Sequence, residues 1–114
     1  MAEIRSFRDL GVYKLAREQA RNIFALSKSF PPEERFSLTD QIRRSSRAVN
    51  AMIAEAWARR RYPAAFINKI DEPLGEAMET QAWLDHAFDC AIWTEINIVL
   101  WTILGKRSVQ CSIV

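Results

Sequence analysis

Glycine and proline are scarce in this chain. Its 114 residues include 3 Gly and 4 Pro, too few for the many turns of a sandwich or a barrel. Few turns mean few, long elements, which favours helices over β-sheet folds and Gly-rich nucleotide-binding folds. Apolar residues make up 49% and charged residues 26%, the balance of a globular protein rather than a disordered one. The length fits a single domain, residues 1–114.

Long apolar runs are also lacking. No stretch reaches the roughly 18 consecutive apolar residues that a membrane-spanning helix needs, so we predict no membrane partner. Residues 1–8 carry charges instead of an apolar run, so we expect no secretory signal. The two cysteines, Cys90 and Cys111, lie in no metal-like spacing. We therefore expect reduced thiols and a cytoplasmic protein.

Histidine is almost absent, which limits the chemistry. His86 is the only one, and Trp83 stands three residues before it where a di-iron bundle needs Glu. We predict no metal, no cofactor and no enzymatic activity, since a Gly-rich phosphate loop is missing too. Glu55 and Glu79 could form an acid/base pair across a bundle. The alternative is structural, with Glu55 paired to Arg59 four residues later.

Apolar side chains recur at steps of three and four residues, which predicts helices. The predicted helices cover residues 9–29, residues 33 or 37 to 61, residues 63–89, and a last helix from residue 94. Their short connections favour an all-α, antiparallel up-down-up-down four-helix bundle. The third helix has a heptad-like seam, formed by Ile67, Ile70, Leu74, Ala77, Gln81, Leu84 and Phe88. Pro73 should kink this helix, because it removes a backbone donor.

Surplus apolar surface predicts association between copies. The first predicted helix carries two neighbouring apolar stripes, the second is rich in Ala and Ser, and residues 109–114 are largely apolar. These features favour a closed oligomer. The chain has four tryptophans, Trp57, Trp83, Trp93 and Trp101. They are interpreted as core or oligomer contacts, and alternatively as a stacking platform for nucleic-acid bases.

Positive charge is concentrated in the first half of the chain. Residues 1–61 contain 13 Lys and Arg against seven Asp and Glu, whereas residues 62–114 contain three against seven. The candidate nucleic-acid-binding residues on the second predicted helix are Arg43, Arg44, Arg47, Arg59, Arg60 and Arg61. Guanidinium groups in such a row can follow phosphates without reading sequence. Alternatively, they pair with the acidic side chains of the third predicted helix.

Several segments together resemble one family. They are SLTDQIRRSS at 37–46, IAEAW at 53–57, RRYP at 60–63, and ETQ at 79–81 followed by WL at 83–84. In this combination the sequence resembles the four-helix-bundle family of the 23S ribosomal RNA intervening-sequence protein. Two positions differ from the common pattern, since Met52 replaces Asn and Ala56 replaces Gly.

The resemblance implies a bacterial, cytoplasmic four-helix bundle that assembles as a homopentamer. The accessory variability determinant of diversity-generating retroelements is similar in fold and assembly, and it associates with nucleic acid and a reverse transcriptase. The resemblance implies no catalytic residues. The resulting hypothesis is a non-enzymatic, homo-oligomeric adaptor that binds nucleic acid, or a protein bound to it, through its basic helix. The alternative is a structural or protein-binding module with no nucleic-acid role.

Overall fold

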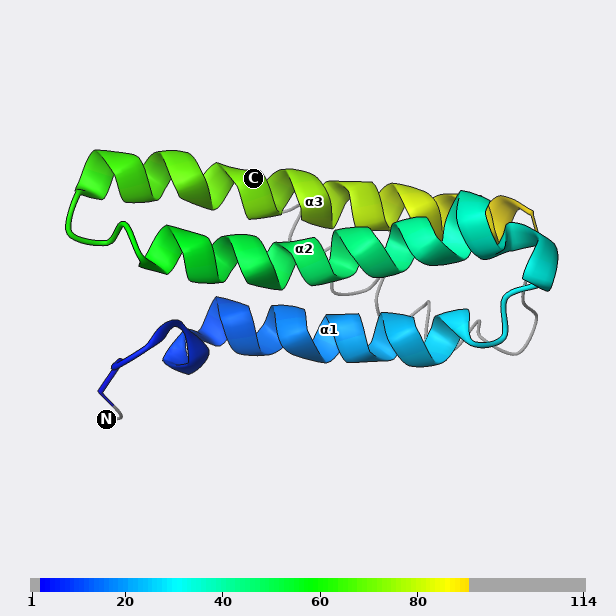
Figure 1. The fold of residues 1–114 in the computed structure, drawn as a ribbon, viewed down its shortest axis with the longest axis horizontal. Helices are drawn as coiled ribbons and strands as arrows, with labels where there is room; N and C mark the ends of the chain where they lie inside the picture. Colours follow the sequence, from blue (N-terminus) through cyan, green and yellow to red (C-terminus); the bar gives the residue numbers. More distant parts are fainter. Residues whose placement is uncertain (1–2, 91–114) are drawn as a thin grey trace.

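Three α-helices and three short helical turns make up the part of the chain that the structure describes. The computed structural model describes residues 3–90. The α-helices are α1 (Gly11–Ser27), α2 (Asp40–Trp57) and α3 (Pro63–Asp89), and no strand occurs between residues 3 and 90. They run up, down and up, with α2 between the other two (Figure 1). This confirms the all-α prediction; the helix predicted from Thr94 lies outside the described residues.

The N-terminal turn is held by its own side chains. A 3-10 turn over Phe7–Asp9 precedes α1. The Ser6 hydroxyl accepts a hydrogen bond from the Arg8 amide at 3.1 Å. The Asp9 carboxylate accepts hydrogen bonds from the Arg5 amide at 2.8 Å and the Ser6 amide at 3.1 Å. These hydrogen bonds form a capping box, which gives the backbone amides at the start of the turn acceptors within the chain.

The entry into α2 is less regular than predicted. A 3-10 turn over Pro32–Glu34 and a π-helical turn over Arg35–Thr39 precede it. The sequence predicted one α-helix reaching residue 61, whereas α2 ends at Trp57. The predicted end was too late, because the chain must leave the helix several residues before Pro63 in order to reverse its direction. Residues 58–61 form that reversal through bonds such as Arg59 N–H to the Ala56 carbonyl, at 2.9 Å.

The third helix begins and ends where the sequence predicted. Pro63 occupies its first turn, where a missing amide costs nothing. The helix continues as one element through Pro73 (Figure 1), so this proline does not end it. The predicted seam is confirmed only in part: Leu84 is buried in the core, and Ile70, Ala77 and Gln81 are half-buried. Ile67, Leu74 and Phe88 are 60%, 51% and 52% exposed, because α3 turns a neighbouring face toward α2.

The core joins all three helices near one end of the molecule. Its cluster of buried residues comprises Ile23, Leu26, Phe30, Leu38, Ile42, Leu84 and Ala87. Between α2 and α3 the buried Ser45 hydroxyl lies 2.8 Å from that of Thr80. Small side chains at this position let the two helices approach closely. On α2, Ile42, Ser45 and Ala56 are fully buried, so these residues lie on its inward face.

Candidate functional site

The six arginines predicted from the second helix do not form one surface. They divide into a group facing α1, one residue facing α3, and a group in the turn after α2. Neighbouring positions on a helix differ by about 100°, so Arg43 and Arg44 point to different partners. The three groups have different electrostatic surroundings.

Arg44 faces the acidic third helix. Its Nη2 lies 2.7 Å from Glu79 Oε2, and its Nη1 lies 3.9 Å from Glu76 Oε2. This residue therefore follows the internal-pairing alternative, and its charge is balanced within the chain.

Arg43 and Arg47 instead face α1 and share one aromatic ring. The Phe24 centroid lies 4.7 Å from the Arg43 guanidinium carbon and 5.4 Å from that of Arg47. The Lys28 ammonium approaches the same ring at 4.9 Å. Arg43 Nε also donates a hydrogen bond to the Ser27 hydroxyl at 2.7 Å. Cation–π contacts hold these cations without neutralising them.

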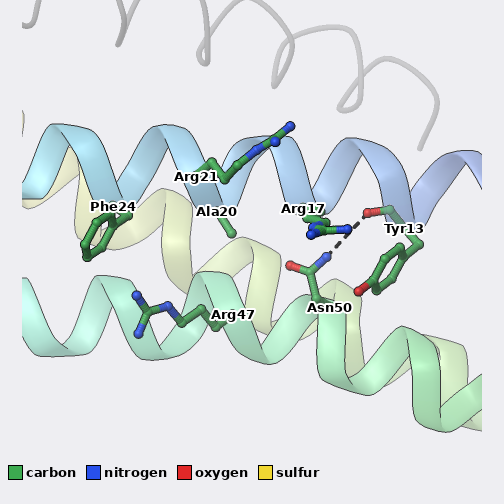
Figure 2. A pocket seen from close by; sticks show the side chains of 7 residues that line it. All are labelled: Tyr13, Arg17, Ala20, Arg21, Phe24, Arg47 and Asn50. Atoms are coloured by element: carbon green, nitrogen blue, oxygen red, sulfur yellow. Dashed lines mark hydrogen bonds between the residues drawn. The ribbon is translucent and has the colours of Figure 1, made fainter. Parts of the chain in front are cut away.

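An open pocket of about 500 Å³ lies between α1 and α2 (Figure 2). The residues that line it are Tyr13, Arg17, Ala20, Arg21, Phe24, Arg47 and Asn50. Three guanidinium groups, two rings and one amide thus surround this space, and none of these lining residues is acidic. Asn50 Nδ2 donates a hydrogen bond to the Tyr13 carbonyl at 3.4 Å, which ties the two helices together.

Sequence reasoning missed the arginines that α1 contributes. Arg17 and Arg21 are exposed, and neither forms an ion pair with any residue between 3 and 90. A signal for them exists in the sequence. Arg17, Arg21, Phe24 and Lys28 follow one another at steps of four, three and four. This spacing puts two cations, a ring and a third cation along one helix face.

A second hollow, of about 390 Å³, adjoins the turn between α1 and α2. It has Lys28, Arg35 and Arg43 on its walls, together with one carboxylate, Asp40. Arg43 belongs to this hollow and also contacts Phe24, so the basic side chains continue from the first pocket into the second.

The arginines at the end of α2 are outside both hollows. Arg60 lies over the Trp57 ring at 4.5 Å and donates a hydrogen bond to the Trp57 carbonyl at 3.2 Å. Arg59 and Arg61 are exposed in the turn.

The two carboxylates considered as an acid/base pair are apart. Glu79 contacts Arg44, whereas Glu55 lies 3.9 Å from Lys69 Nζ. Residues 44 and 55 are 11 positions apart on α2, or about 16 Å along its axis. The proposed pair is therefore wrong, because the two groups do not share a site.

The other candidate groups bring no further site together. No cluster of three potential metal-ligating side chains occurs in the described part of the chain. The His86 ring is exposed, with its centroid 5.9 Å from that of Trp83. Trp57 and Trp83 are half-buried, while Trp93, Trp101 and Cys111 lie outside the described residues.

Comparison with known families gives one match. The model of the 23S rRNA-intervening sequence protein family matches residues 8–101, most of the chain. The chain belongs to this family. Neither a curated protein nor a solved structure matches it. The family assignment agrees with the resemblance seen in the sequence motifs. Across residues 3–90, this family member has no helix that is long and apolar enough to cross a membrane.

Proposed function

We propose that this protein is a non-enzymatic, homo-oligomeric adaptor that binds nucleic acid through a surface formed by α1 and α2. This α1–α2 basic surface consists of Arg17, Arg21, Arg43 and Arg47. It revises the surface predicted from the sequence, because Arg44 is neutralised by Glu79. The turn arginines at positions 59–61 extend the positive charge beyond one end of α2.

One observation carries the proposal. Arg17, Arg21 and Arg47 line a single pocket with no acidic side chain among its lining residues. Guanidinium groups that line one pocket without carboxylate partners favour anions with several oxygens, and phosphate suits the guanidinium fork. The family description names a 23S rRNA intervening sequence, so a ribosomal RNA segment is a natural first probe.

Assembly is the second part of the proposal. Exposed apolar side chains remain on α1 and α3, including Val12, Leu74 and Met78, each more than half exposed. Burying them would favour a closed ring, a homopentamer by family resemblance, that repeats the basic surface around an axis. Each subunit is proposed as an antiparallel four-helix bundle in the cytoplasm, with the fourth helix supplied by residues from 94 onward.

The test is the salt dependence of RNA binding. Fluorescence anisotropy with a labelled RNA segment should show binding that weakens steeply as salt rises. Each phosphate contact contributes about 0.7 to the slope of log affinity against log salt for a single strand. Arg17→Ala, Arg21→Ala and Arg47→Ala together should lower both the affinity and the slope. Arg44→Ala is the matched control, because its charge is already paired with Glu79.

A second candidate function is protein binding without nucleic acid. The exposed apolar side chains of α3 favour it, because such side chains suit a protein interface. This candidate predicts no RNA or DNA binding even at low salt, together with recovery of a bound protein when the adaptor is purified from its native cells. If the recovered protein is a reverse transcriptase held through nucleic acid, nuclease treatment should release it from the adaptor, which would support the first candidate function instead.

A further inference from the structure

We propose that the pocket between α1 and α2 holds a nucleotide of a single strand, with its base against Phe24 and its phosphate at the arginines. The protein would then prefer single-stranded nucleic acid over duplex. This inference rests on the proposed function and makes it specific. The general proposal requires only phosphates on a basic surface, whereas this one requires an unpaired base inside the pocket.

The size and polarity of the pocket suit a nucleotide. Its volume of about 500 Å³ falls in the range of small-molecule sites. Ala20 faces the space between the helices, so its small side chain leaves room there (Figure 2). Arg17 lies at the end of the pocket near Tyr13 and Asn50, Arg47 bends toward Phe24 at the other end, and Arg21 extends away from α2 (Figure 2). A strand lying along the pocket would therefore meet guanidinium donors from both α1 and α2.

Aromatic side chains lie at the two ends of the pocket. Phe24 is 38% exposed and stands at one end, and Tyr13 stands at the other (Figure 2). Arginines at the Phe24 ring do not prevent stacking, since guanidinium planes also stack on bases. The Tyr13 ring packs edge-on against Phe7, with centroids 5.0 Å apart, which fixes its position. The combination of rings and cations is typical of single-strand binding.

Asn50 offers a contact to the edge of a base. Its Nδ2 is occupied by the Tyr13 carbonyl. Its Oδ1 points away from that bond toward the pocket (Figure 2), and it accepts no hydrogen bond from residues 3–90. An amide oxygen in this position can accept a hydrogen bond from an exocyclic amino group of a base.

A duplex would not satisfy this pocket. Paired bases are already stacked on both faces, so a duplex presents mainly phosphates to a recess between two helices. Electrostatics alone gives the opposite order, because a duplex carries about one charge per 1.7 Å of its axis, twice the density of one strand. A preference for the single strand therefore separates base insertion from charge attraction.

The test compares three probes by fluorescence anisotropy at one salt concentration. The probes are a labelled single strand, the same strand in a duplex, and a strand of equal length whose bases are replaced by abasic sites. The wild-type protein should bind the single strand at least several-fold more tightly than either other probe. RNA and DNA versions of each probe identify which sugar is preferred.

Two variants locate the effect in the pocket. Phe24→Leu should lower single-strand affinity by about tenfold, the effect of losing one base stack, while duplex affinity changes little. Ala20→Leu should act in the same direction by filling the pocket without removing a charge. Phe36→Leu is the matched control, because this ring is 73% exposed with Arg35 over it at 5.3 Å, yet does not line the pocket.

The possible results are distinguishable. Equal or tighter binding of the duplex, or equal binding of the abasic strand, would overturn the inference and leave the basic-surface proposal standing. An unchanged preference in the Ala20→Leu protein would also overturn it, and this variant remains decisive if Phe24→Leu fails to fold. No binding of any probe at low salt would reject the proposed function itself.

Discussion

At the residue scale, the position of each arginine on its helix decides what its charge can do. Arg43 and Arg44 are adjacent in sequence, yet one contacts an aromatic ring and the other two carboxylates. Cation–π contact leaves the positive charge available to an incoming anion, whereas a carboxylate neutralises it. A count of arginines on a helix therefore overestimates the charge available to a ligand.

Arg44→Ala is expected to have a small effect on stability. Its side chain is 54% exposed and that of Glu79 is 39% exposed, so solvent screens the pair. Exposed ion pairs contribute roughly 0–1 kcal/mol. Urea denaturation should show a decrease in the free energy of unfolding within that range, and a double-mutant cycle with Glu79→Ala isolates the pair. A coupling energy well above it would mean that the pair is shielded from water.

Asp9 makes the N-terminal turn sensitive to acid. Hydrogen bonds from the backbone amides of Arg5 and Ser6 to its carboxylate lower the pKa of Asp9 below its ordinary value. Because the folded pKa is depressed, the stabilisation is complete above the ordinary pKa and is lost as pH falls through the lowered one. The Arg5 and Ser6 amide resonances in NMR spectra should shift over that acidic range.

Variants of Asp9 and of the nearby Glu3 test this assignment. Asp9→Asn should abolish the acidic shift of the two amide resonances. Glu3→Gln should leave it, since Glu3 contacts only the exposed Arg5 side chain. Persistence of the shift in the Asp9→Asn protein would contradict the assignment.

At the element scale, the regular parts of the helices were predictable and their ends and faces were less so. Pro63 fixed the start of α3, because proline is suited to a first helical turn. The end of α2 was overestimated, since the residues at 58–61 are acceptable in a helix and leave it only to reverse the chain. The π-helical turn at Arg35–Thr39 has no signal in apolar periodicity.

The contact of α2 with α3 tolerates a smaller residue better than a larger one. Ser45→Ala should cost about 1 kcal/mol or less, because the Thr80 hydroxyl still donates to the Glu76 carbonyl at 3.0 Å. Ser45→Leu should cost about 1–3 kcal/mol by overpacking a fully buried position. Urea denaturation of both variants tests this order. Equal stabilities would show that the helices separate readily at this point.

At the scale of the whole molecule, the candidate site arises from two helices together. The notion of a basic surface on the second helix could be derived from composition, yet the arginines of α1 became relevant only when α1 and α2 were placed side by side. The partners of Glu55 and Glu79 likewise became known only when α2 and α3 were placed side by side. Contacts between helices depend on how far each helix is shifted along its axis and rotated about it. Periodicity alone does not determine the rotation of α3, because apolar side chains occur both on its buried face and on its exposed face.

The exposed apolar face of α3 provides the last prediction. Leu74 is 51% exposed on the middle of this helix. If copies of the chain meet there, Leu74→Lys should reduce the mass measured by sedimentation to that of one subunit, because a buried unpaired ammonium is costly. Ile4→Lys is the control, at a residue 53% exposed in the lead-in before α1. An unchanged mass with a lowered melting temperature would show instead that the face is covered within the subunit, and an assembly through α3 would be rejected.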